Sequence, residues 1–160
     1  RPANALAKVI IAELRRRFGQ DIDISFFYTT RAREAWIKSV HGHLLRSIQL
    51  TDDFAQFRAR FPELMGPDAE AAAMSRALAP IPVQTAALET YRDHPEGPAA
   101  ALLDMLDIPA DLRATLKPAR RSNTGQSASL RDALLGLNRQ NLRKPALNAA
   151  KEAAIRKAAR

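Results

Sequence analysis

The sequence predicts an α/β fold in which helices cover both faces of a parallel sheet. Predicted elements follow one another in the order helix, strand, helices, strand, helices. The first predicted strand, residues 22–30, is apolar on both faces, which is typical of a sheet that is covered on both sides. The 160 residues, of which 46% are hydrophobic, suffice for a domain with its own core. We therefore expect a three-layer α/β architecture that is predominantly helical.

The first three elements follow from side-chain periodicity. Residues 3–18 predict an amphipathic helix that ends at Gly19, because its apolar residues recur at helical spacing. The strand at 22–30 comes next, and a helix is expected from about Arg33 to Arg46. The apolar residues of that helix are Trp36, Ile37, Val40 and Leu44.

The remaining elements are shorter. The run Thr51-Asp52-Asp53 predicts the cap of a short helix that carries three phenylalanines, and another helix is expected over 68–78. Pro82 favours an edge or a strand end for the second strand, 81–88. Helices are expected over 98–106 and 110–116, then around Leu130–Leu137 and after Pro145. Two strands are few for such a sheet, so we expect residues 1–160 to form a single, partial domain and a fragment of a longer reading frame.

Positive charge is concentrated at the C-terminal end. The chain has a net charge of +8, yet residues 117–160 hold eleven Lys and Arg and only two acids, Asp132 and Glu152. Such asymmetry favours a polyanion, an acidic surface or a phosphate-bearing ligand near this basic helical part. The alternative is a solvated helical tail.

Several classes of function lack support. The chain has no cysteine, which excludes disulfides and thiolate chemistry. His41 and His43 are two residues apart, a spacing that does not bring two ligands to one side of a helix, so no metal site is predicted. A Ser–His–Asp triad stays open, because its members need not be close in sequence. No signal peptide and no membrane-spanning run is visible, and we expect a cytoplasmic protein.

A strand that ends in arginine and continues into a helix is the main candidate site. Arg31 follows Thr30 at the end of the first strand, and Ser39 lies eight positions later, about two turns into the helix. Arginine presents a planar fork of donors that suits phosphate or sulfate, and a helix start adds unpaired N–H groups. The structural alternative is a strand-end salt bridge of Arg31 and a surface hydroxyl of Ser39.

This segment resembles the 3′-phosphate-binding element of sulfotransferases that use 3′-phosphoadenosine 5′-phosphosulfate (PAPS). The pattern Thr-Thr-Arg-x-x-Glu-Ala-Trp-x-x-Ser is similar to a bacterial branch of that family. The resemblance implies a P-loop-like sulfotransferase fold, PAPS as donor, and a carbohydrate or small-molecule acceptor that the sequence does not identify. It also implies that Arg31, Ser39 and Thr30 bind the nucleotide. A later basic loop resembles the family's second 3′-phosphate contact and implies roles for Arg121 and Asn123.

One departure from the family limits the expected activity. The sequence contains no glycine-rich loop followed by Lys and Ser or Thr, which the family uses to hold the 5′-phosphosulfate. No general base is assigned either, and no metal is expected. We therefore expect a sulfotransferase fragment that is inactive alone and that becomes an enzyme only with an upstream phosphate loop. A related possibility is that the fold is kept and catalysis is lost.

The alternative from another class is a non-enzymatic helical module whose basic C-terminus binds a polyanion. Exposed Lys and Arg would contact phosphates there, with affinity that falls steeply as salt rises. The absence of interleaved aromatic residues and of a recognised reading motif does not favour specific binding of nucleic acid.

Overall fold

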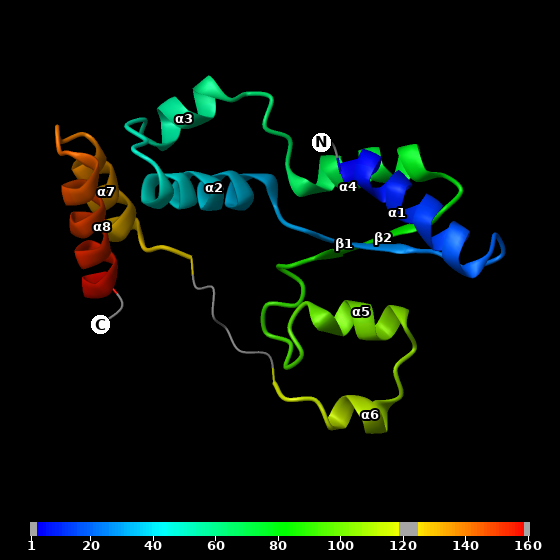
Figure 1. Ribbon diagram of the computed structural model, residues 1–160. Coiled ribbons are helices and arrows are strands. Elements are labelled where there is room, and N and C mark those ends of the chain that lie inside the picture. The colour runs from blue at the N-terminus through cyan, green and yellow to red at the C-terminus, as the bar shows by residue number, and fades with distance from the viewer. Residues whose placement is uncertain (1–2, 119–124, 159–160) are drawn as a thin grey trace. The chain divides into compact units, whose positions relative to one another are not determined.

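The computed structural model describes residues 3–118 and 125–158 of the chain (Figure 1). The chain folds into two compact units. Unit 1 consists of Arg1–Arg33 and Met65–Arg120, and unit 2 of Glu34–Leu64 and Arg121–Arg160. The α/β class and the predominance of helix are confirmed. The expectation of a single partial domain stays a prediction.

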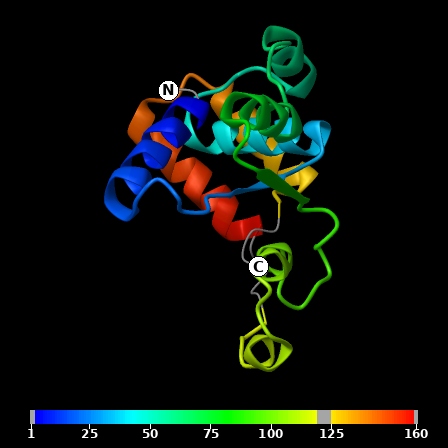
Figure 2. The ribbon, with the colours of Figure 1, turned by 90° about the vertical axis from the view of Figure 1, so that its right-hand side faces the viewer.

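Unit 1 contains two parallel strands with helices on both sides. Strand β1 (Phe26–Thr30) pairs with β2 (Val83–Ala87), in a register that places Phe26 beside Val83 and Thr30 beside Ala87. Helices α1 (Ala3–Phe18) and α4 (Pro67–Leu78) lie on one side of the strands. Figure 2 shows α5 (Ala99–Met105) on the other side, and α6 (Ala110–Ala114) follows it.

The core of unit 1 lies between the strands and the pair α1 and α4. Ala7 and Ile11 of α1 pack against Met74 and Leu78 of α4, and all four are buried. Alternate residues of a strand point to the same face, and the side chains on the covered face extend this cluster. They are Ile24, Phe26, Tyr28, Ile81 and Val83.

Pro82 explains why the paired strands are shorter than the sequence predicts. The Phe26 N–H donates to Pro82 O over 2.9 Å, so the backbone of Pro82 faces β1. Proline has no N–H to donate, so the ladder cannot extend back to Ile24. The predicted strand 22–30 is therefore paired only over 26–30, and the predicted strand 81–88 only over 83–87.

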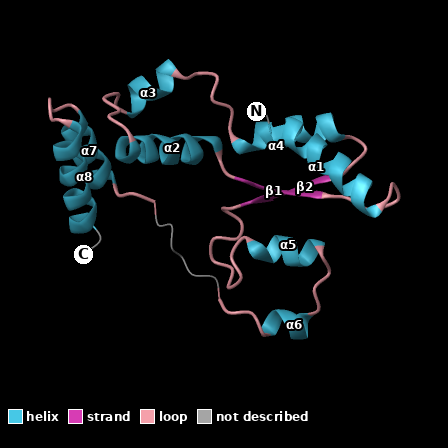
Figure 3. Cartoon of the chain, viewed as in Figure 1, coloured by secondary structure: helices cyan, strands magenta, loops and turns pink. Residues whose placement is uncertain are grey.

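Unit 2 is all helical in the residues that the structure describes (Figure 3). It contains α2 (Arg33–Ser47) from Glu34 onward, with α3 (Phe54–Arg60), α7 (Ala128–Asn138) and α8 (Lys144–Ala158). Helices α7 and α8 pack against each other. The buried core side chains, drawn from α2, α3, α7 and the loop before α3, are Ile37, Leu45, Leu50, Phe57 and Leu134.

Two polar side chains inside unit 2 bind the backbone at the end of α2. Asn138 Nδ2 donates to Leu45 O over 3.0 Å and to Leu50 O over 2.9 Å. Lys151 Nζ donates to Ile48 O over 2.7 Å. The last carbonyls of a helix have no partner within it, and here α7 and α8 supply partners. Both side chains are buried, Asn138 with 1% and Lys151 with 4% of its surface exposed.

We expect Asn138→Ala to destabilise unit 2 by about 2–4 kcal/mol, because two buried carbonyls would lose their donor. Chemical denaturation monitored by circular dichroism measures the change. Asn148→Ala, an exposed asparagine of α8, is the matched control and should change stability by less than about 0.5 kcal/mol. Equal midpoints for the two variants would contradict the role of Asn138.

Candidate functional site

The carboxyl ends of β1 and β2 bring Arg31 and Glu89 together in unit 1. Since the strands are parallel and in register, the residues that follow each strand lie side by side. Leu88 N–H donates to Thr30 O over 2.9 Å, which extends the pairing past the strand ends. Arg31 Nε lies 3.9 Å from Glu89 Oε1, and the same oxygen accepts the Ala32 N–H over 3.3 Å. The strand-end salt bridge of Arg31, which was the structural alternative to a phosphate site, is therefore present.

The five predicted nucleotide-binding residues fall in three places. Arg31 lies at the strand end with its side chain 37% exposed, and Thr30 is buried in the same unit. Ser39 is exposed on α2 in unit 2. Because Arg31 and Ser39 belong to different units, the structure describes each within its own unit, and their joint role stays a prediction. Arg121 and Asn123 lie outside the described residues.

The start of α2 needs a glycine beside it. A Cβ at Gly66 would lie 3.1 Å from Arg33 Cα and 3.0 Å from Arg33 Cβ, closer than side chains normally approach. Gly66 also precedes α4, where Pro67 occupies the first turn. The missing side chain of Gly66 therefore lets the start of α4 approach the segment that follows β1.

A second polar cluster in unit 1 lines a cavity of about 380 Å³ beside α6. Arg113 donates through Nε to Glu96 Oε1 over 3.0 Å and also binds Asp104. The hydrogen bond from Arg113 lowers the pKa of Glu96, and these carboxylates raise the pKa of Arg113. Because Arg113 is committed to two acids, it is not available to hold a phosphate.

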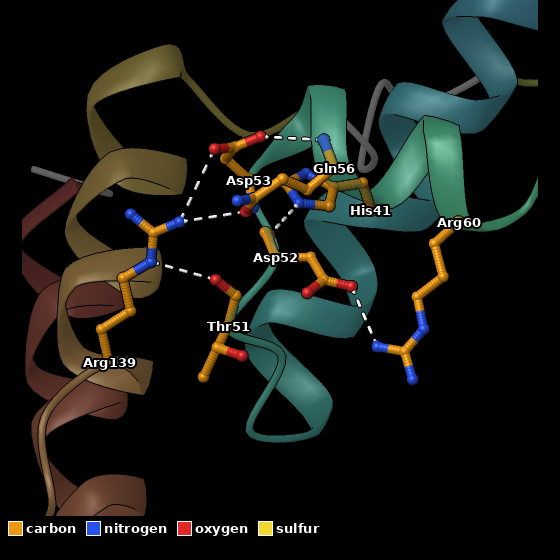
Figure 4. A network of polar contacts seen from close by, with 7 residues as sticks. All are labelled: His41, Thr51, Asp52, Asp53, Gln56, Arg60 and Arg139. Carbon is orange, nitrogen blue, oxygen red and sulfur yellow. Dashed lines mark hydrogen bonds and ion pairs between the residues drawn. The ribbon is translucent and has the colours of Figure 1, made fainter.

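The polar network of unit 2 fixes the start of α3 (Figure 4). Asp53 accepts the Gln56 N–H over 2.9 Å, and Gln56 accepts the Asp53 N–H over 3.0 Å, which forms a capping box. Arg139, the residue that follows α7, donates to Thr51 O over 3.0 Å and lies 3.6 Å from Asp53 Oδ2. The network therefore fastens α3 to α7, and its contacts are those of a structural cap.

Histidine 41 lies within this network and is 3% exposed. His41 Nε2 is 3.0 Å from Asp52 O, and since a carbonyl only accepts, Nε2 carries the proton. The Asp52 carboxylate instead pairs with Arg60 at 3.1 Å. In a catalytic triad the carboxylate accepts a hydrogen bond from a ring N–H of the histidine, whereas His41 contacts only the backbone carbonyl of Asp52, so the two residues are not arranged as a triad pair. His41 also lines a cavity of about 210 Å³ in unit 2.

The described part of the chain holds neither a cluster of metal-ligating side chains nor a membrane-spanning helix. Over residues 3–118 and 125–158, no group of three or more His, Asp or Glu is arranged to hold a metal ion. None of the helices in those ranges has both the length and the apolar character that crossing a membrane requires. The chain matches no protein-family model, no curated protein and no solved structure.

Two residues of the candidate sites were missed or only implied by the sequence. Glu89 directly follows the predicted second strand, and no local pattern connects it with Arg31. Tyr28 donates its hydroxyl to Glu70 of α4 over 2.8 Å. Burial, together with that hydrogen bond, raises the pKa of Tyr28. Neither contact has a sequence signal, because the partners are 58 and 42 positions apart.

We expect acid to weaken unit 1 through Glu96. Its pKa is lower in the folded chain, so the unfolded chain binds more protons as the pH falls through the ordinary range of a glutamate. The free energy of unfolding should therefore fall between about pH 5 and about pH 3, and less steeply in Glu96→Gln. Urea unfolding at several pH values measures this, with Asp111→Asn, an exposed acid of α6, as control. Parallel profiles for wild type and Glu96→Gln would refute the expectation.

Proposed function

We propose that this chain supplies the 3′-phosphate-binding element of a PAPS-dependent sulfotransferase, and that its fold is part of the three-layer, P-loop-like sulfotransferase fold. The observation that carries the proposal is the parallel pair β1 and β2, with Arg31 directly after β1 and α2 beginning at Arg33. Open α/β sheets bind ligands outside the carboxyl ends of their strands. Arg31 lies at that end.

The chemistry of Arg31 suits the phosphate of such a nucleotide. Its Nε faces Glu89, and no other polar partner of Arg31 occurs among the described residues. The two terminal nitrogens of the guanidinium are therefore left for two parallel hydrogen bonds to phosphate oxygens. By the resemblance, Ser39 adds a hydroxyl, and Arg121 and Asn123 complete the contact.

The proposed reaction is in-line transfer of a sulfuryl group from PAPS to a hydroxyl or an amine. The bond between sulfur and the phosphate oxygen of the donor breaks as the acceptor attacks, and 3′,5′-ADP leaves. Arg31 and Ser39 act in this reaction by fixing the register of the donor. Residues 1–160 contain no phosphate loop of the expected type, so the proposal assigns binding rather than transfer to this chain alone.

Binding of two nucleotides tests the proposal. Calorimetric titration should show that 3′,5′-ADP binds more tightly than 5′-AMP, because only the former carries the 3′-phosphate. Arg31→Ala should weaken the binding of 3′,5′-ADP by about 10- to 100-fold, since a charged hydrogen bond contributes about 1.5–3 kcal/mol. The affinity for 5′-AMP should stay unchanged. Arg16→Ala removes an equal charge from α1 of the same unit, where Arg16 pairs with Glu13.

The control should bind 3′,5′-ADP as the wild type does. Equal affinity of the wild-type protein for both nucleotides would reject the assignment. If 3′,5′-ADP is preferred but no transfer occurs when a phosphate loop is supplied upstream, the chain has kept the fold and lost catalysis.

The burial of Lys151 reduces the number of cations that could contact a polyanion in the alternative function. This residue belongs to the basic C-terminal part, yet it is buried and donates to the end of α2, and burial lowers its pKa. The exposed cations of the described part of α8 and the preceding loop are Arg143, Lys144, Arg156 and Lys157, together with Arg139, which is bound to Thr51 O.

Salt dependence distinguishes the polyanion alternative from the nucleotide proposal. If the alternative holds, affinity for a single-stranded oligonucleotide should fall by at least about tenfold between 50 and 200 mM salt. The double variant Arg156→Ala and Lys157→Ala should weaken that binding, whereas Arg31→Ala should not. Fluorescence anisotropy measures both. Weak oligonucleotide binding that does not change with salt would exclude the polyanion alternative.

A further inference from the structure

One carboxylate oxygen holds both residues that connect β1 to α2. Glu89 follows β2, and the parallel register places it beside Ala32. Its Oε1 accepts the Ala32 N–H over 3.3 Å and lies 3.9 Å from Arg31 Nε. The backbone of Glu89 is held in turn, because its carbonyl accepts the Arg92 N–H over 3.4 Å. The backbone of Glu89 is therefore fixed after β2, and its side chain contacts the segment that follows β1.

The contact restrains Arg31 from one edge only. The ion pair joins Nε to Glu89 Oε1, and neither Nη1 nor Nη2 of Arg31 donates a hydrogen bond to Glu89. The side chains of Arg31 and Glu89 are 37% and 36% exposed, so solvent and ligands reach both. An arginine whose backbone is fixed by a neighbouring hydrogen bond, as at Ala32, loses less conformational freedom when its terminal nitrogens bind a phosphate.

We propose that Glu89 is a positioning residue for the phosphate that Arg31 binds. This inference rests on the proposed function. Glu89 fixes the turn at Arg31 and Ala32 through the Ala32 N–H, and it aims the terminal nitrogens of Arg31 at the ligand. The opposite effect would be competition, in which the carboxylate only neutralises Arg31 and must be displaced by a phosphate.

The distances favour positioning over competition. The separation of 3.9 Å between Arg31 Nε and Glu89 Oε1 is longer than a hydrogen bond, and a half-exposed ion pair of this kind contributes little. The contact to the Ala32 N–H is shorter and involves a rigid backbone donor. The acceptor oxygen, more than the negative charge, is then what the site requires.

Two substitutions separate the oxygen from the charge. Glu89→Gln keeps an acceptor for the Ala32 N–H and removes the charge, whereas Glu89→Ala removes both. We expect Glu89→Ala to reduce the preference for 3′,5′-ADP over 5′-AMP by about fivefold to tenfold, and Glu89→Gln to keep it within about threefold. Glu70→Ala, which removes another hydrogen-bonded acid of unit 1, should leave the preference unchanged.

Calorimetric titration of the full chain gives the preference, and hydrogen exchange of the Ala32 amide reports the turn without any ligand. Exchange should be faster in Glu89→Ala than in the wild type and Glu89→Gln. Tighter binding of 3′,5′-ADP by both Glu89 variants would overturn positioning in favour of competition. An unchanged preference in Glu89→Ala would also overturn it. A wild-type protein without any preference would instead overturn the proposed function, and the positioning role with it.

Discussion

The parallel pairing of β1 with β2 is the constraint on which unit 1 depends. It joins segments that are 57 positions apart at Phe26 and Val83, and it aligns them residue by residue. Parallel strands require a long crossover between them, and here the crossover contains α2, α3 and α4. The register alone decides that Ala32 lies beside Glu89 and that Phe26 and Tyr28 share a face with Val83. The candidate site and the core of unit 1 are thus consequences of one alignment.

Unit 2 depends on buried side chains that donate hydrogen bonds to the backbone carbonyls at the end of α2. Its core includes Leu45 near the end of α2, where the last helix carbonyls lack partners within the helix. Asn138 and Lys151 meet that need from two helices that are close to 100 positions away in sequence. The cost is desolvation of an ammonium group, seen as the lowered pKa of Lys151. Positive charge in a sequence is therefore not always charge at a surface.

The strand end at Arg31 illustrates how a structural and a functional interpretation share the same contacts. The long ion pair between Arg31 and Glu89 joins Nε to the acid, and the terminal nitrogens of Arg31 have no hydrogen bond to that acid. By contrast, Arg113 has both edges occupied by Glu96 and Asp104. The difference between the two arginines is the number of acids around each, and it makes Arg31 the better candidate for binding an external anion.

The sequence by itself determined the class of the fold and the type of every described helix and strand, because periodicity, caps and prolines act over a few residues. The cap of the short helix after Thr51-Asp52-Asp53 and the helix with Leu130 and Leu134 are examples. It also singled out Arg31. Tertiary structure decided the extent of the strands, which the missing N–H of Pro82 limits through its partner Phe26. It alone decided that Glu89 accompanies Arg31 and that Asn138 and Lys151 are buried, because these contacts join residues whose spacing in the chain carries no local pattern.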